Sequence, residues 1–325
     1  MKIGVVGNGM IVDRFLKDAA ALKQAEVTAI CVREGSREKG AALAARYGIP
    51  KVDTDYTHFL NTTEMDAVYL GISNHVHFPY AKAALEAGKH VICEKPFTVH
   101  ACQAKELAQM AEAKHLFLWE AFKLPYSPVF EAIKEHLPDV GPIKLVQCNY
   151  SRISSRYGQY KAGNILPAFD PQTAGGCLYD INLYNLHFVT CLFGKPQKVT
   201  YYANRGHNGV DTSGIGILEY GTFQAVCCGA KDSSSPCGAV IQGEDGYIQV
   251  EGPVSSAKRA CLYQNGKETC LAEFEDNGQL TEEIIEFERQ FREQDFPACY
   301  NMLKHSLIMM DVVDAACSSA GITYR

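Results

Sequence analysis

Short apolar runs alternate with amphipathic stretches over the first 120 residues. Each apolar run predicts a strand, and the stretches between them repeat their apolar residues at helical spacing. The predicted strands are residues 2–6, 26–32, 65–72, 89–93 and 116–120, and the predicted helices are residues 11–22, 36–48, 78–88 and 100–114. Because the strands are apolar throughout, both faces of their sheet should be covered, which is typical of a parallel α/β sheet.

The pattern changes near residue 123, where two prolines in the stretch KLPYSPVF indicate a junction. Beyond it, strands follow one another across short polar turns, which predicts an open, mostly antiparallel sheet. The predicted strands are residues 142–154, 198–205, 214–220, 223–230, 238–243 and 246–252, and the predicted helices are residues 175–194, 281–294 and 301–321. We therefore expect an α/β domain over residues 1–122 and an α+β domain over residues 123–325.

Composition narrows the class of protein. The chain has 325 residues, 47% hydrophobic and 21% charged, which is enough for two separate cores. A net charge of -6 argues against nucleic acid and anionic membranes as partners. No apolar window is long enough to span a bilayer, and the first residues lack the pattern of a signal peptide. The 13 cysteines are scattered without a C-x-x-C pair, so we expect reduced thiols in a cytoplasmic protein.

A glycine turn, GNGMIV, follows the first predicted strand. Gly7 permits the tight turn, and Gly9 lets the backbone approach a pyrophosphate at the N-terminus of the next helix. Val12 stands where the dinucleotide fingerprint has Gly or Ala, so helix and strand should pack less closely. A plain strand-to-helix turn is the alternative, but its place at the first strand favours a dinucleotide site. The residues predicted to bind the dinucleotide here are Gly7, Asn8, Gly9, Met10 and Ile11.

The end of the second predicted strand bears on the choice between NAD and NADP. An acidic residue there would bind the ribose hydroxyls, whereas an arginine would accept a 2′-phosphate. The stretch CVREGSREKG places Arg33 at the strand end and Arg37 shortly after it, while Glu34 follows the first arginine. This favours NADP over NAD as the cofactor. The alternative is that Arg33 and Arg37 are solvated charges at a helix start.

Two opposite charges, Glu94 and Lys95, stand between an apolar strand and Pro96. Charges in such a place need a ligand or a partner. Lys95 would lie at the carboxyl end of a parallel strand, where the ligand crevice of this kind of sheet opens, and could hydrogen-bond a reacting oxygen. Pro96 fixes the direction in which the chain leaves the strand.

Three stretches together, GNGMIV, SNHVHFPYAKAALEAGKHVICEKP and GGCLYDINLYNLH, resemble the Gfo/Idh/MocA oxidoreductase family over essentially the whole chain. The stretch LFLWEAF and a tyrosine in the third motif are most similar to the branch containing dimeric dihydrodiol dehydrogenase. The resemblance implies an NAD(P)-binding Rossmann domain, followed by a substrate-binding and oligomerisation domain. It also implies hydride transfer between nicotinamide and a sugar, polyol or cyclic diol or ketone, in a homodimer or homotetramer.

In the first domain, the resemblance implies that Asn74 and His77 line the nicotinamide end of the site and that Glu94 reaches its ribose. Ser73 belongs to the same predicted crevice. Asn74 has a helix cap as its alternative role. His75 and His77 form H-x-H with no further ligand at metal spacing, so no metal site is expected.

The catalytic residues predicted with the resemblance are Lys95, Asp180 and Tyr184. Helical spacing places Asp180, Tyr184 and His187 on one face. Asp180 would orient the substrate or Lys95. Tyr184 stands where many members have a catalytic histidine, and it would move the proton while Lys95 lowers its pKa. His187 is the competing acid-base candidate, with a packed histidine as its alternative role. The resemblance further implies a cis Lys95–Pro96 bond.

Substrate contacts are predicted at Trp119, Arg152, Tyr157 and His187. A solvated loop explains the stretch YSRISSRYGQYKAG equally well. Two other functions stay open: a non-catalytic NAD(P)-sensing regulatory protein of the same fold, and a glycosidase that uses tightly held NAD for transient oxidation. Retention of the three catalytic residues together argues against the sensor. Cofactor kept through purification without net NADH release would indicate the glycosidase.

Overall fold

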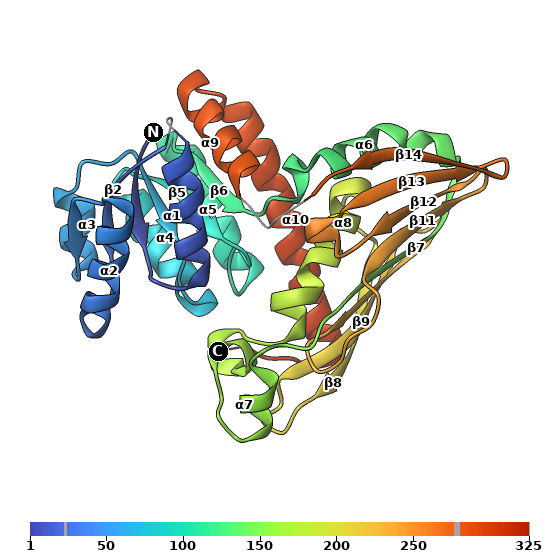
Figure 1. Ribbon diagram of the computed structural model, residues 1–325. Helices are drawn as coiled ribbons and strands as arrows, with labels where there is room; N and C mark the ends of the chain where they lie inside the picture. Colours follow the sequence, from blue (N-terminus) through green and yellow to red (C-terminus); the bar gives the residue numbers. More distant parts are fainter. Residues whose placement is uncertain (23–24, 276–279, 325) are drawn as a thin grey trace. The chain divides into compact units, whose positions relative to one another are not determined.

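The computed structural model describes residues 1–22, 25–275 and 280–324, and its contacts divide the chain into two compact units (Figure 1). Unit 1 holds the described residues of 1–123 together with 280–307. Unit 2 holds those of 124–275 together with 308–324. Each unit is built on its own sheet.

Unit 1 contains a six-stranded sheet in the order β3-β2-β1-β4-β5-β6 within its described residues. Every neighbouring pair in it is parallel. Its strands are β1 (Lys2–Val6), β2 (Glu26–Cys31), β3 (Lys51–Asp53), β4 (Ala67–Leu70), β5 (His90–Glu94) and β6 (Leu118–Ala121). The direction of the strand order reverses between β1 and β4, so a crevice is expected at the carboxyl ends of these two strands.

The helices of unit 1 come from the segments between these strands and from residues 280–307. They are α1 (Met10–Ala21), α2 (Arg37–Tyr47), α3 (Tyr56–Thr62), α4 (His77–Glu86), α5 (Ala101–Lys114) and α9 (Thr281–Glu293). The sequence predicted neither β3 nor α3. A three-residue strand at the edge of a sheet is too short to show an apolar period, and the helix after it has only seven residues.

Helix α9 lies far along the chain and yet packs in unit 1. Trp119 on β6 donates from Nε1 to Oε1 of Gln290 on α9 at 2.7 Å, and its ring stacks on Phe287 with centroids 5.3 Å apart. Leu280 N, just before α9, donates to Asp18 Oδ2 of α1 at 2.7 Å. The sequence placed everything after residue 122 in the second domain, whereas contacts group 280–307 with the first unit. As an assignment of functional domains, the boundary after residue 122 stays a prediction.

Unit 2 contains an eight-stranded sheet in the order β14-β13-β12-β11-β7-β10-β9-β8, counted over its described residues. Only the β7–β10 pair within this part of the chain is parallel. The strands are β7 (Ile143–Ser151), β8 (Lys198–Arg205), β9 (Asp211–Glu219), β10 (Gln224–Ala230), β11 (Gly238–Gly243), β12 (Tyr247–Glu251), β13 (Arg259–Gln264) and β14 (Lys267–Glu273). The predicted fold class, a parallel α/β sheet followed by a large, mostly antiparallel sheet, is thereby confirmed.

The helices of unit 2 include a π-helix. They are α6 (Pro128–His136), α7 (Tyr157–Lys161), the π-helix η7 (Leu178–Asn182), α8 (Leu183–Phe193) and the second part of α10 (Phe296–Ala320). In Figure 1, α6 and α8 lie against one face of the sheet. None of the helices in the described residues combines the length and the apolar character that crossing a membrane requires.

The two faces of the unit 2 sheet differ in burial. Along β12, Ile248 and Val250 are buried, while Tyr247, Gln249 and Glu251 on the other face are exposed. The register of the paired strands identifies the residues of the other strands that lie on the same face. The large apolar side chains exposed on this face are Tyr202, Ile215 and Tyr247. The sheet therefore keeps one face with apolar groups in contact with solvent.

Candidate functional site

The glycine turn after β1 has the geometry that the fingerprint requires. Gly7 has φ +117°, its N–H donates to Cys31 O at 2.9 Å, and a Cβ there would lie 2.3 Å from the carbonyl oxygen of Gly71. An L residue is excluded at this position by both conformation and space. Gly9 caps the N-terminus of α1, and a Cβ placed on it would meet no atom within 4 Å. The first peptide groups of α1 are therefore open to a ligand.

Val12 does not loosen the packing as predicted. The side chain of Val12 is wholly buried. A Cβ atom added to Gly71 would lie only 2.5 Å from Cγ2 of Val12, so the two residues are in close contact. The bulk added on α1 is thus accommodated by a glycine directly after β4. The small residue at this contact is thus Gly71, after β4, and not the residue on α1, so helix and sheet can still pack closely.

The other residues of the turn suit an anionic ligand. Nδ2 of Asn8 is buried and makes no hydrogen bond to any residue that the structure describes. Such a donor beside a helix N-terminus fits a phosphate oxygen. Met10 is 76% exposed and Ile11 half-buried. All the predicted residues of the turn thus lie at the carboxyl edge of the sheet.

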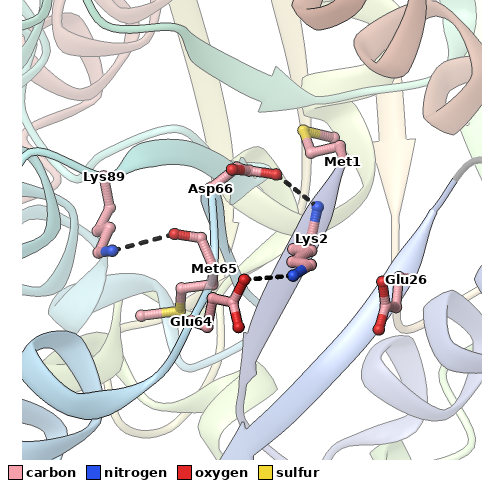
Figure 2. Close-up of a pocket in the computed structure, with 7 residues that line it drawn as sticks. All are labelled: Met1, Lys2, Glu26, Glu64, Met65, Asp66 and Lys89. Carbon is pink, nitrogen blue, oxygen red and sulfur yellow. Dashed lines mark hydrogen bonds and ion pairs between the residues drawn. The ribbon is translucent and has the colours of Figure 1, made fainter.

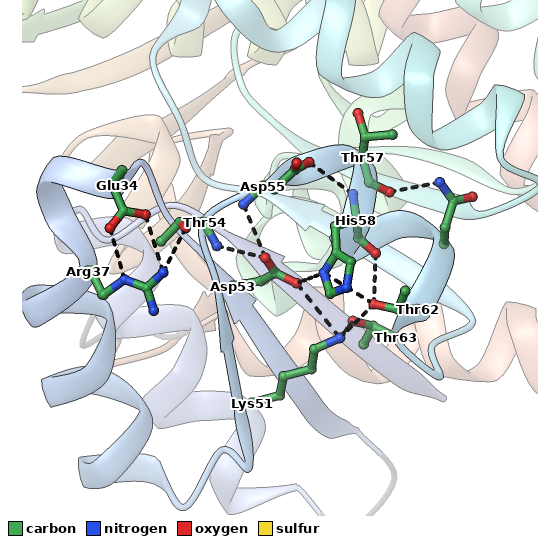
Figure 3. A network of polar contacts seen from close by, with 11 residues as sticks. Glu34, Arg37, Lys51, Asp53, Thr54, Asp55, Thr57, His58, Thr62 and Thr63 are labelled. Atoms are coloured by element: carbon green, nitrogen blue, oxygen red, sulfur yellow. Dashed lines mark hydrogen bonds and ion pairs between the residues drawn. The ribbon is translucent and has the colours of Figure 1, made fainter.

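The two arginines after β2 have different surroundings. Arg37 Nε lies 3.1 Å from Glu34 Oε1, and its Nη2 donates to Thr54 Oγ1 at 3.1 Å (Figure 3). Arg33 is exposed, and its guanidinium makes no hydrogen bond or ion pair within the described parts of the chain. Arg33 is therefore the arginine available to a phosphate, while Arg37 is held by Glu34, just before its helix, and by Thr54, after β3.

Ser73 and Asn74 follow β4 at the same edge. Ser73 is the N-cap of the short helix η2 (Asn74–Val76), and the N-cap of α4 is Val76. Asn74 thus stands at the N-cap position of neither helix, and its predicted contact with the cofactor stays a prediction.

His77 is wholly buried. Its Nδ1 lies 2.8 Å from Pro96 O, and its Nε2 lies 3.2 Å from Ile72 O. Burial lowers the pKa of this imidazole. The ring therefore connects the loop after β4 with the turn after β5, and we do not carry the predicted cofactor contact of His77 forward.

Glu94 and Lys95 at the end of β5 have different exposure. Glu94 is 6% exposed, and Tyr69 OH donates to its Oε1 at 2.7 Å. Burial raises the pKa of this carboxyl to about 7, although Tyr69 and Lys95 act in the opposite direction. Lys95 is partly exposed, and its bond to Pro96 is cis. The carboxylate is thus turned into the core, and its predicted contact with ribose stays a prediction.

The motif GGCLYD opens the helical stretch of unit 2. Gly176 has φ +123°, and Leu178 N donates to the buried Asp211 Oδ2 at 2.7 Å. The π-helix begins here and carries Asp180, whose side chain is 41% exposed and lies 2.8 Å from Nζ of the buried Lys231. π-turns of this kind are frequent at functional sites.

Lys231 was not predicted from the sequence. No motif surrounds it, and its one signal is the position of a charge directly after the strand β10. Lys95 follows β5 in the same way.

His187 does not share an exposed face with Asp180 and Tyr184, which are both partly exposed. Tyr184 is partly exposed and lies near Tyr150, with ring centroids 5.9 Å apart, but His187 is wholly buried. The prediction assumed α-helical spacing throughout, and the π-turn changes the phase between Asp180 and α8. Burial of His187 favours Tyr184 as the residue that can meet a substrate.

The remaining predicted substrate residues are dispersed. Trp119 is 2% exposed with its indole N–H bonded to Gln290, so we do not carry its substrate contact forward. Tyr157 packs on Tyr160 and Phe169. Arg152 is exposed in the loop after β7. Over the described residues, no group of three or more His, Cys, Asp or Glu side chains is placed to hold a metal ion.

A hollow with a volume of about 540 Å³ lies at the other edge of the unit 1 sheet (Figure 2). Several polar groups around it already have partners: Lys2 Nζ pairs with Glu64, Lys2 N donates to Asp66 Oδ2 at 2.7 Å, and Lys89 Nζ donates to Met65 O at 3.0 Å. This hollow is at the amino ends of the strands, away from the glycine turn, and we assign it no role in the chemistry.

Comparisons with known proteins agree with this geometry. Residues 1–122 match the GFO/IDH/MocA model described as an oxidoreductase family with an NAD-binding Rossmann fold, and residues 139–249 match the GFO/IDH/MocA C-terminal domain. The chain is 31% identical over 324 residues to the scyllo-inositol 2-dehydrogenase (NADP(+)) of Bacillus subtilis, covering 100% of this chain and 98% of that protein. It is 29% identical over 272 residues to the trans-1,2-dihydrobenzene-1,2-diol dehydrogenase of Xenopus tropicalis, covering 82% and 79% respectively.

Among solved structures, a 3-ketoreductase from Actinomadura kijaniata in complex with NADP and TDP-benzene aligns with a TM-score of 0.86. The alignment covers 98% of both chains at 22% identity, so this likeness concerns the fold alone.

Proposed function

Because the chain belongs to the Gfo/Idh/MocA oxidoreductase family, we propose that it uses NADP to interconvert a secondary alcohol and a ketone on a cyclic polyol or diol. The family supplies the class of reaction. The names of two relatives, an inositol dehydrogenase and a dihydrobenzenediol dehydrogenase, support a ring with adjacent hydroxyl groups as the substrate. A sugar is the other member of the proposed substrate class.

The preference for NADP is supported by Arg33. Its side chain is exposed at the end of β2, where the 2′-phosphate of a bound dinucleotide is recognised in this fold. The pyrophosphate would be held by the turn of Gly7 and Gly9, with Asn8 as a further donor. When bound, the nicotinamide ring gives or takes the hydride.

The single observation that carries the proposal is the position of Lys95. It follows β5 directly, on the same sheet edge as the glycine turn, and is partly exposed. Its ammonium donates a hydrogen bond to the substrate oxygen and stabilises negative charge that develops there. Tyr184 gives or takes the proton of that oxygen, and Asp180 accepts a hydrogen bond from a neighbouring hydroxyl.

We also propose a cytoplasmic homo-oligomer. The outer face of the unit 2 sheet supports the oligomer, because Tyr202, Ile215 and Tyr247 expose apolar surface on it. A second copy of the chain would cover these side chains. The cytoplasmic location is supported by the 13 free thiols, since reduced cysteines are typical of that compartment.

Absorbance of NADPH at the nicotinamide band tests the reaction. The purified protein is incubated with NADP and a panel of cyclic polyols, diols and sugars, and in the reverse direction with NADPH and cyclic ketones. We expect turnover with at least one cyclic polyol or diol, and faster turnover with NADP than with NAD. Binding of NADPH without turnover of any compound would contradict the proposal and favour the sensor. Cofactor retained through purification, with glycoside cleavage and no net NADH, would favour the glycosidase.

A further inference from the structure

Lys231 joins three segments of unit 2 at the end of β10. Its side chain is 1% exposed, and its Nζ lies 2.8 Å from Asp180 Oδ2 in the π-helix. The same ammonium donates to the carbonyl oxygen of Ala168 and lies 4.4 Å from the centre of the Phe169 ring. The backbone is fixed as well, because Lys231 N donates to Thr212 O at 2.8 Å. The position of the ammonium is therefore well determined by its neighbours.

The surroundings of this ammonium are acidic. Lys231 and the carboxylates of Asp180, Asp211 and Asp232 all act electrostatically on the buried thiol of Cys177. Burial raises the pKa of Asp211 to about 6, and the hydrogen bonds it accepts and the charge of Lys231 oppose that shift. The positive charge of Lys231 is thus placed among three carboxylates, of which Asp180 is the one in direct contact with it.

A buried lysine is energetically unfavourable at a position with only a structural role. Taking an ammonium out of water is unfavourable unless it is paired and hydrogen-bonded, and an apolar side chain would fill a buried strand end without that penalty. Here the buried cation contacts a carboxylate that is itself 41% exposed. The arrangement directs a fixed charge at a group that solvent and ligands can reach.

We propose that Lys231 is a positioning residue that holds the Asp180 carboxylate ionised and in one orientation. This inference rests on the proposed function, because Lys231 takes part in the reaction through Asp180. A cation in contact with a carboxylate favours its charged form, and the ion pair restricts rotation of the side chain. Asp180 is then a fixed hydrogen-bond acceptor for a substrate hydroxyl, and proton transfer is left to Tyr184.

The first test compares Lys231→Met with Lys195→Met. Lys195 also pairs with an aspartate, since its Nζ lies 2.7 Å from Asp311 Oδ2, but its side chain is 57% exposed. We expect Lys231→Met to lower kcat by about tenfold or more and to move the acid limb of the kcat pH profile upward by about one pH unit or more. The KM for NADPH should stay within about twofold, and the Lys195→Met control should match the wild type in all three.

A lysine with only a structural role would give a different result for Lys231→Met. The melting temperature would fall while the acid limb stayed in place. That result, or a kcat equal to the wild-type value, would overturn the inference.

A second measurement follows the Asp180 carboxyl without turnover. In protein labelled with carbon-13 at the aspartate side chains, the signal of Asp180 is identified by its loss in Asp180→Asn. We expect its titration midpoint to move to higher pH by about one unit or more in Lys231→Met, or in Lys231→Gln if the methionine variant does not fold. An unchanged midpoint would overturn the inference even in an active enzyme. A shifted midpoint in a protein that turns over no substrate supports the inference about Asp180 and contradicts the proposed function alone.

Discussion

Lys95 and Lys231 hold the same position relative to a strand, and yet their surroundings differ. Lys95 directly follows β5 and remains partly exposed at the carboxyl edge of the parallel sheet. Lys231 directly follows β10 and is buried against Asp180, a carbonyl oxygen and an aromatic ring. A lysine that keeps contact with solvent can meet reacting atoms itself. A buried lysine can act only through the group it fixes, so the two ammonium groups have separate parts in the proposed reaction.

The largest effect is expected at Lys95. Replacing it in Lys95→Met removes the donor to the substrate oxygen, and kcat should fall by about a thousandfold or more. Lys89→Met is a matched control, because Lys89 lies at the amino end of the same strand and donates to Met65 O. Steady-state kinetics with NADPH binding measured by fluorescence separates chemistry from affinity. A Lys95→Met enzyme with the kcat of the wild type would contradict the role given to this lysine.

Tyr184 should show the next largest effect. Tyr184→Phe keeps the ring and removes the hydroxyl, and we expect kcat to fall by about a hundredfold with the KM for NADPH nearly unchanged. His187→Asn is the comparison, because His187 is buried and should affect stability more than kcat. If His187→Asn lost the larger part of kcat in a folded protein, the proton would have to be assigned to the histidine.

A substitution at Arg33 tests whether its exposed guanidinium selects NADP over NAD. Arg33→Ala should weaken NADP binding by about tenfold to a hundredfold, because a charged hydrogen bond to phosphate is worth about 1.5–3 kcal/mol. NAD binding should change little, since NAD lacks the 2′-phosphate. Arg37→Ala should have the smaller effect on NADP, because Glu34 and Thr54 already bind that side chain. Titration calorimetry of the wild type and the two variants with both cofactors gives the six affinities, and equal losses for NAD and NADP in Arg33→Ala would argue against selection by Arg33.

Glu94 is expected to affect stability and its pH dependence, with the smallest effect on turnover. Burial raises the pKa of its carboxyl from about 4.5 to about 7 in the folded chain. The folded state therefore binds more protons than the unfolded state between these values, and stability is lost as the pH rises through that window. This pKa difference changes the free energy of unfolding by about 3 kcal/mol at most. The raised pKa of Asp211 causes a further loss of stability with rising pH, in a lower pH range.

Glu94→Gln should reduce this pH dependence. The test is urea denaturation of the wild type and the variant at pH 5 and pH 8. We expect a smaller difference in the free energy of unfolding between the two pH values for the variant. An equal difference in both proteins would show that Glu94 is not the group responsible.

The sequence predicted the parallel sheet and its carboxyl edge well, because long apolar strands and a glycine turn carry direct signals. Gly7, Gly9, Arg33 and Lys95 all follow predicted strands and lie at that edge. The consequence predicted for Val12 was wrong, because the glycine that makes room for it follows β4, about sixty residues away in the chain. Such compensation depends on tertiary contacts that a local pattern cannot show.

The misses at the candidate site have two physical causes, long-range contacts and local helix geometry. Lys231 and Asp180 are 51 positions apart, and only the sheet brings them into contact. The π-helix departs from the α spacing that was predicted, and His187 beyond it is buried. Trp119 was expected near substrate, but α9 from the end of the chain covers it. The misses at Lys231 and Trp119 thus concern contacts between segments distant in sequence, and the one at His187 concerns local helix geometry.

Transfer of deuterium is the most direct measurement of the proposed reaction. The wild-type protein is mixed with NADPH carrying deuterium at both positions of C4 of the nicotinamide and with cyclic ketones derived from inositols and dihydrodiols, and the products are read by mass spectrometry. We predict one deuterium on the carbinol carbon of at least one product, and its loss in Lys95→Met protein that still binds NADPH. Tight binding of the labelled cofactor with no deuterium in any product would contradict hydride transfer by this chain.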